Sequence, residues 1–159
     1  QVPDTPAFRA APAGALVEDN LPARMAVAEV STRIARHGGV AYWIDYGGWR
    51  SQGDTLQALR QHAPDDPLAH PGQADLTAHV DFEPLAALAP AVAFDSQGAV
   101  LTRLGIDARA ERLASALSGT ALESHLAAHR RLTHAEEMGS LFKVLAVTSA
   151  GAPPPPGFA

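Results

Sequence analysis

The sequence predicts a single α/β domain, and three observations carry that prediction. The chain has 159 residues, of which 47% are hydrophobic, enough for one core but hardly for two. Segments with helical periodicity alternate along it with short apolar runs. The strongest run, residues 40–45 (VAYWID), lies between two glycine pairs. This alternation is typical of helices packed on a largely parallel sheet.

The first predicted elements are an irregular lead-in and one helix. Residues 1–14 carry three prolines, which disfavour regular structure. A helix should begin after Asn20, whose side chain can cap it, with Pro22 in its first turn, and should end at Gly38. Its apolar face is formed by Ala23, Val27, Val30 and Ile34. The domain itself is expected over residues 15–148.

The apolar run at residues 40–45 predicts a strand covered on both faces, because it is almost continuously apolar and rich in β-formers. Residues 49–77 are polar and rich in turn signals, with one short helical stretch expected around residues 55–61. An irregular stretch of this length inside a compact domain is usually functional. We therefore expect a lid or substrate loop there.

The remaining elements follow the same alternation. Asp81 is expected to cap a helix that runs through Leu85 and Leu88. Thr120 and Glu123 have the spacing of a capping box. Further strands are expected at 91–94 and 141–147, further helices at 99–104, 107–118 and 121–131, and a solvated, disordered proline-rich tail at 149–159.

Composition excludes several classes of protein. The net charge is −5, with a single lysine, so the basic excess of a nucleic-acid-binding domain is missing. The absence of cysteine excludes disulfides, thiolate zinc sites and a cysteine nucleophile. No apolar run is long enough to cross a membrane, and no secretory leader is recognisable. We expect a soluble, cytoplasmic protein. Because position 1 is Gln1 and not Met, we also expect a segment before it.

Candidate site residues lie where strands end. Asp45 and Tyr46 follow an expected strand, at the edge where α/β sheets bind ligands, although Asp45 could instead only anchor a turn. Asp75, His79 and Asp81 fall within seven positions and could orient a cationic substrate or bind a divalent ion, although the spacing matches no zinc motif. The alternative is that Asp81 is a helix cap and His79 a structural histidine.

Other motifs carry less chemistry. Gln97 could present its amide to a substrate or belong to an ordinary turn. His125 and His129 share one helix face, but no glutamate follows His125, so the metalloprotease motif fails and an exposed histidine pair is expected. The sequence also contains no nucleophile elbow, no Walker A loop and no dinucleotide-binding glycine motif.

Five segments, in order and with compatible gaps, resemble the MidA-like class I methyltransferases, which use S-adenosylmethionine. They are residues 38–47 (GGVAYWIDYG), 53–62 (GDTLQALRQH), 66–82 (DPLAHPGQADLTAHVDF), 96–106 (SQGAVLTRLGI) and 138–146 (MGSLFKVLA). The resemblance covers only the family's C-terminal half. It implies a Rossmann-like sheet in which residues 40–45, 91–94 and 141–147 are strands five, six and seven. The family's cofactor motifs precede this region, so no cofactor-binding residue is assigned and the chain alone should be inactive.

The resemblance also implies a substrate, because the family's mitochondrial members are implicated in arginine methylation during assembly of respiratory complex I. A guanidinium with a pKa above about 12 must lose a proton before it attacks, and carboxylates can grip it and accept that proton. Asp45, Asp75 and Asp81 are the catalytic candidates, and the substrate-binding candidates are Tyr46, His79 and Gln97. No metal ligand is assigned.

Two rival functions remain open. The first is a non-enzymatic interaction module, derived from the same fold, that pairs with another chain through an exposed strand and so forms a homo-oligomer. The second is a metal-dependent hydrolase built on Asp75, His79 and Asp81.

Overall fold

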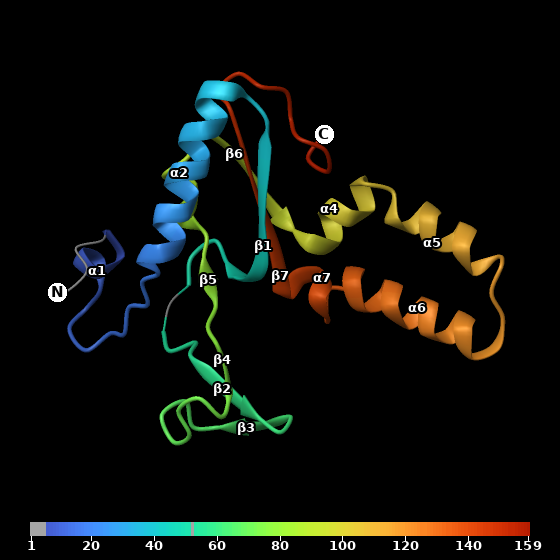
Figure 1. Cartoon of the computed structure of the whole chain (residues 1–159), viewed down its shortest axis with the longest axis horizontal. Coiled ribbons are helices and arrows are strands. Elements are labelled where there is room, and N and C mark those ends of the chain that lie inside the picture. The colour runs from blue at the N-terminus through green and yellow to red at the C-terminus, as the bar shows by residue number, and fades with distance from the viewer. Residues whose placement is uncertain (1–5, 52) are drawn as a thin grey trace.

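The computed structural model describes residues 6–51 and 53–159 and shows a mixed α/β fold (Figure 1). The strands are β1 (Val40–Gly48), β2 (Gln57–Arg60), β3 (Ala63–Asp65), β4 (Asp75–Thr77), β5 (Val80–Asp81), β6 (Ala91–Ser96) and β7 (Phe142–Thr148). The helices are α1 (Pro6–Ala10), α2 (Leu21–His37), α3 (Glu83–Ala86), α4 (Gln97–Arg103), α5 (Ile106–Ala114), α6 (Gly119–Thr133) and α7 (Met138–Leu141).

The main sheet has the order β5-β1-β7-β6. β7 runs antiparallel to both β1 and β6, and only the short β5 is parallel to β1. The expectation of a parallel sheet is therefore wrong for most of these pairs. Ser96, the last residue of β6, pairs with Lys143 near the start of β7, so the chain returns to the sheet at the end where it left. A return of this kind makes neighbouring strands antiparallel.

Helix α2 is confirmed with the predicted ends. The Asn20 side chain accepts a hydrogen bond from the Ala23 amide at 3.0 Å, and Gly38, with φ of 72°, ends the helix. Val27 and Ile34 on the predicted apolar face are buried. The face packs on the core that Val27, Phe82, Leu85, Ala86 and Leu145 form.

Strand β1 is confirmed, but it is not covered on both faces. The side chains of Val40, Tyr42 and Ile44 on one face stay 42%, 38% and 55% exposed. α4 contacts β6 and β7 on the inner part of the sheet, where Val144 and Ala146 of β7 are buried. Among the described residues, β1 has a strand on its other side only at Gly47 and Gly48, where β5 pairs with it. The rest of this edge is open.

The region expected to be irregular forms a second, three-stranded antiparallel sheet with the order β3-β2-β4, here called the small sheet. The expected short helix around residues 55–61 is wrong, since this stretch contains β2. Gln61 and His62 both have positive φ, 52° and 65°, and make the mirror-image turn that joins β2 to β3. Asp81 is also not a helix cap: it lies in β5, and the cap position of α3 is Phe82.

Helices α5 and α6 form a hairpin that projects away from the main sheet (Figure 1). The prediction of an exposed histidine pair is wrong, because both side chains tie α6 to α5. His125 Nε2 lies 2.9 Å from the Ala110 carbonyl oxygen, and His129 Nε2 lies 2.9 Å from Asp107 Oδ1. The predicted capping box is also wrong, since the cap position of α6 is Ser118 and no side chain caps that end.

Both ends of the described chain carry local structure or contacts with the rest of the protein. α1 lies within the expected lead-in, of which residues 1–5 fall outside the described part. In the tail, Pro155 and Gly157 are buried. The hydroxyl of Tyr42 donates to the Pro156 carbonyl at 3.0 Å, and Arg103 Nε donates to the Gly157 carbonyl at 2.6 Å. These contacts join Pro156 and Gly157 to the rest of the protein, whereas residues 151–154 are exposed.

None of the helices in the described part of the chain combines the length and the apolar character that crossing a bilayer requires.

Candidate functional site

The candidate site lies at the carboxyl end of β1, and a glycine allows β5 to reach it. A Cβ added at Gly47, where φ is +154°, would lie 2.1 Å from the Val80 carbonyl oxygen. Any side chain at this position would push β5 away. Because Gly47 has none, Val80 pairs with it and Asp81 pairs with Gly48. The sequence therefore places the Asp81 carboxyl group beside the end of β1.

Asp81 lines a cavity of about 360 Å³, whose wall also includes Glu18, His79 and Leu85. Its Oδ1 atom is buried and has no hydrogen-bond partner among the described residues. Burial raises the pKa of this carboxyl group, although hydrogen bonds from the backbone of Ser51 and Glu83 oppose the rise. Asp81 is thus a carboxyl group with a free oxygen and an increased affinity for a proton.

Glu83, which follows β5, is hydrogen-bonded to the two residues that follow β1. Arg50 Nε and Nη2 each donate to the Glu83 carboxylate at 2.7 Å, and the Trp49 indole N–H donates to it at 3.3 Å. The hydrogen bond from Arg50 lowers the pKa of Glu83. Sequence reasoning missed this group, because Arg50 and Glu83 are 33 positions apart and no local pattern joins them.

Tyr46 and His79 meet at the same end of β1, as the proposed shared site requires. Their ring centroids are 5.9 Å apart in an edge-to-face arrangement. The other neighbour of Tyr46 is Phe142, whose ring centroid is 5.6 Å away. The backbone N–H of His79 donates to Thr55 Oγ1 at 2.9 Å. An aromatic pair of this kind offers ring surface to a cationic group.

Asp45 does not converge with Asp81. Its Oδ1 accepts a hydrogen bond from the Tyr46 amide at 2.9 Å, which is the turn-anchoring role considered for it. Asp81 pairs with Gly48, three residues further along β1. Three residues of strand span roughly 10 Å. Asp45 is also not among the residues that line the cavity that contains Asp81.

Asp75 and Gln97 also lie apart from Asp81. Asp75 belongs to β4, where it is exposed and pairs with Leu59 in the small sheet, below the main sheet in Figure 1. Gln97 is only 8% exposed, and its Nε2 donates to the Leu132 carbonyl at 2.9 Å. Its amide links α4 to α6. Of the six predicted site residues, the structure brings Tyr46 and His79 into contact and places Asp81 beside the end of the same strand.

A divalent-metal centre is not supported. Across residues 6–51 and 53–159, no three side chains of His, Asp or Glu come close enough to hold a metal ion. Asp75, His79 and Asp81 therefore do not form the ligand set that the metal-dependent hydrolase requires.

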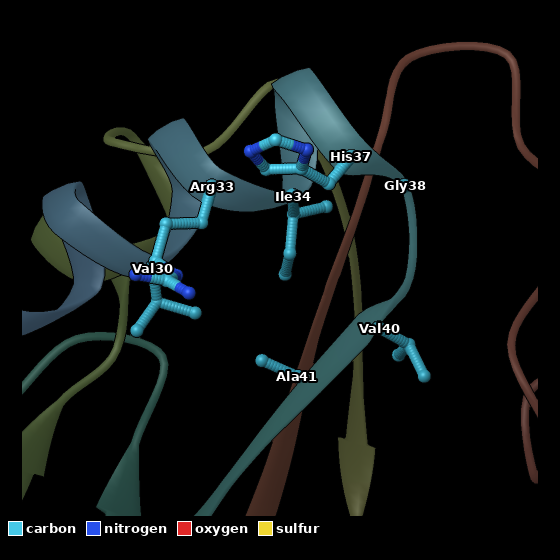
Figure 2. Close-up of a pocket in the computed structure, with 7 residues that line it drawn as sticks. All are labelled: Val30, Arg33, Ile34, His37, Gly38, Val40 and Ala41. Atoms are coloured by element: carbon cyan, nitrogen blue, oxygen red, sulfur yellow. The ribbon is translucent and has the colours of Figure 1, made fainter.

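A second cavity, of about 340 Å³, lies at the opposite end of β1. Figure 2 shows side chains of α2, such as Val30 and Ile34, on one side and Val40 and Ala41 of β1 on the other. The nine residues from Val40 to Gly48 span roughly 26 Å of strand, measured from the first Cα to the last. This cavity is at the amino end of the strand, away from the edge where α/β sheets bind ligands.

Comparison with known proteins places the chain in a protein family. Residues 4–100 match the profile of the family described as "Putative S-adenosyl-L-methionine-dependent methyltransferase". The match covers more than half of the chain, and the chain belongs to this family.

The chain is also similar to individual proteins that carry names. The chain is 35% identical over 137 residues to "Protein arginine methyltransferase NDUFAF7 homolog, mitochondrial" of Drosophila melanogaster, covering 82% of this chain and 31% of that protein. It is 32% identical over 126 residues to the human "Protein arginine methyltransferase NDUFAF7, mitochondrial", covering 76% of this chain and 29% of that protein. The chain spans about a third of the length of these relatives.

Two crystal structures from Burkholderia thailandensis share the fold. A native structure of an uncharacterized protein superposes with a TM-score of 0.66 at 30% identity, covering 84% of this chain and 39% of that one. A member of the same superfamily bound to S-adenosyl-homocysteine superposes with a TM-score of 0.64 at 30% identity, covering 84% of this chain and 38% of that one. The predicted fold class, part of a methyltransferase α/β fold, is confirmed.

The family implies S-adenosylmethionine, but the described residues do not form a cradle for it at the end of β1. A cofactor loop of glycines leaves its backbone open to the ligand. Here Val80 fills the space beside Gly47, and the Arg50 carbonyl oxygen lies 3.3 Å from a Cβ built on Gly48. These glycines serve strand pairing and the following turn, and we assign no chemical step through the cofactor to them.

Proposed function

We propose that the chain is the C-terminal part of an S-adenosylmethionine-dependent methyltransferase that modifies a protein side chain, with arginine as the acceptor. The observation that carries this proposal is Asp81, whose buried Oδ1 has no partner among the described residues and which lies beside the end of β1. Family membership and relatives named as arginine methyltransferases support the reaction class and the acceptor.

The chemistry of arginine suits such a carboxyl group. Guanidinium keeps its proton at any ordinary pH, since its pKa is above about 12, and must lose it to become a nucleophile. A carboxylate can hold the guanidinium and accept the proton in the same contact. Burial raises the pKa of Asp81, which increases its capacity to hold that proton. Tyr46 and His79 would place aromatic surface beside the cation.

The other two proposed carboxylates fit different tasks. Asp45 keeps one oxygen on the Tyr46 amide and would orient that residue. Asp75, exposed on the small sheet, would contact a part of the protein substrate away from the reacting arginine. The missing cofactor pocket would come from the rest of the protein, and the open edge of β1 at residues 40–46 is a surface on which a further strand can pair.

The test is methyl transfer by the full-length protein to arginine-containing protein substrates, read by mass spectrometry. Asp81→Asn should lower kcat by about 100-fold or more, the usual contribution of a general base. Glu29→Gln on the exposed side of α2 is the matched control and should leave kcat unchanged. Wild-type turnover in Asp81→Asn would remove Asp81 from the mechanism. Absence of methyl transfer by the wild-type protein would favour the non-enzymatic module.

A binding measurement tests the proposal that the cofactor pocket comes from the rest of the protein. The melting temperature of the 159-residue chain should not change with S-adenosylhomocysteine, because its own glycines form no cradle. A clear rise would show that the cofactor site lies within this chain.

A further inference from the structure

The small sheet is closed at its base by a contact between the two segments that lead into and out of it. Thr55 precedes β2, and His79 follows β4. The His79 N–H donates to Thr55 Oγ1 at 2.9 Å, across 24 positions of sequence. Figure 1 shows the small sheet standing away from the main sheet. The contact at its base therefore affects the orientation of the small sheet.

Glu18 fastens that base to the body of the protein. One oxygen of its carboxylate accepts the Thr55 N–H at 3.0 Å, and the other accepts the Thr55 hydroxyl. Glu18 lies two residues before Asn20, the cap of α2, and α2 packs on the core. Two hydrogen bonds to one carboxylate are strong and directional.

The position of His79 follows from this connection. The Thr55 hydroxyl donates to Glu18, which leaves its lone pairs to accept from His79. The His79 ring then lies edge-to-face against Tyr46. Glu18 and His79 also line the cavity that contains Asp81. Hydrogen bonds through Thr55 thus link Glu18 to the aromatic pair and to the base of the small sheet.

We propose that Glu18 is a positioning residue for the protein substrate: it acts through Thr55 to hold His79 against Tyr46 and to fix the small sheet beside the site. This inference rests on the proposed methyltransferase function. The substrate segment that the small sheet would meet has an apolar side chain next to its arginine, because Leu59, on the same face as Asp75, is 45% exposed. Glu18 touches no reacting atom, so its loss should weaken substrate binding more than turnover.

The first arm of the test measures position in the 159-residue chain by NMR. Glu18→Ala should move the His79 imidazole resonances toward their unstructured values, since the ring leaves Tyr46. Amide exchange at Thr55 and His79 should rise at least tenfold while exchange in β7 stays constant. Glu29→Ala, exposed on α2, is the matched control and should change neither signal. Unchanged His79 resonances in Glu18→Ala would overturn the proposal.

A second pair of variants separates the hydrogen bonds from general damage. Thr55→Val keeps the shape of the side chain but removes the hydroxyl that joins Glu18 to His79, and should reproduce the effect of Glu18→Ala. Thr55→Ser keeps the hydroxyl and should restore most of the wild-type signal. Equal spectra for the two Thr55 variants would contradict the connection.

The second arm measures kinetics in the full-length protein. Glu18→Ala should raise KM for the protein substrate about tenfold and change kcat less than twofold. An active wild-type enzyme whose KM is unaffected by Glu18→Ala would overturn the positioning role. An inactive wild-type enzyme would instead overturn the methyltransferase function, so the two failures are distinguishable.

Discussion

Different interactions stabilise the main sheet and the small sheet. In β7, at the centre of the main sheet, Val144, Leu145, Ala146 and Val147 are at most 2% exposed. In the small sheet only Ala58 is buried among the strand residues, and ion pairs and hydrogen bonds join its parts. Burial is distributed over many contacts, whereas the polar links are few and specific. The small sheet is therefore the part that single polar substitutions can move.

The largest effect should come from the main sheet. Leu145→Ala removes a side chain that is fully buried against α2 and α3. We expect unfolding to be about 2–5 kcal/mol easier, the usual cost of a leucine cavity. Urea denaturation followed by circular dichroism measures it. A loss below about 1 kcal/mol would mean that burial does not dominate this sheet.

The next effect tests the contact that brings β5 to β1. Gly47→Ala forces a methyl group against the Val80 backbone, which cannot move without breaking the strand pair. We expect a loss of about 1–3 kcal/mol and increased amide exchange in β5. Gly72→Ala is the control, because φ there is also positive, +79°, but no atom lies within 4 Å of the added group. Equal losses in the two variants would remove steric exclusion as the cause.

Replacing Asp81 should have a smaller effect, and it should increase stability where the two preceding substitutions decrease it. Burial raises its pKa in the folded state above the unfolded value of about 3.9. Between the unfolded pKa and the folded pKa, the folded chain binds more protons than the unfolded chain. The contribution of Asp81 to stability therefore falls as the pH rises across this range. Asp81→Asn should raise stability at pH 7 by about 1 kcal/mol, the lower end of the cost of an unpaired buried group. Thermal melts from pH 4 to 8 measure this, and a lower melting temperature in the variant would contradict it.

The smallest effect should be confined to the small sheet. Burial would raise the pKa of Asp65, but hydrogen bonds from His70 and Arg60 outweigh it and the pKa is lowered. The stabilisation from the hydrogen bonds of Asp65 with His70 and Arg60 is thus fully present above about pH 3.9. It is lost as the pH falls through the pKa of Asp65 in the folded state. Proteolysis of residues 57–77 should accelerate over that range in the wild type, whereas Asp65→Asn should be fast throughout. Global melting that tracks the same transition would show that the two sheets are not independent.

Local signals made the main elements predictable. Helix α2 has a capping asparagine, an early proline and a terminal glycine, all within one segment. β1 has glycine pairs on both sides. The small sheet was missed because its hairpin turn uses Gln61 and His62, which carry no recognisable turn signature although both adopt positive φ. The hydrogen bond between Arg103 and the Gly157 carbonyl was not predictable from sequence, because the two residues are 54 positions apart.

The candidate site was predictable only in part for the same reason. Tyr46 was selected because it follows a predicted strand, and His79 and Asp81 because they cluster with Asp75 in sequence. The structure gathers Tyr46, His79 and Asp81 at one end of β1. Asp45 precedes Tyr46 in sequence, but its carboxylate accepts the Tyr46 amide and does not line the cavity that contains Asp81. Glu18 carries no motif, and only the fold reveals its contact with Thr55.

The open edge of β1 has a consequence for association. Unpaired backbone groups beside exposed Val40, Tyr42 and Ile44 form a template on which other strands can add. The strand whose carboxyl end carries the candidate site therefore also offers, along its first residues, a surface for pairing with another strand.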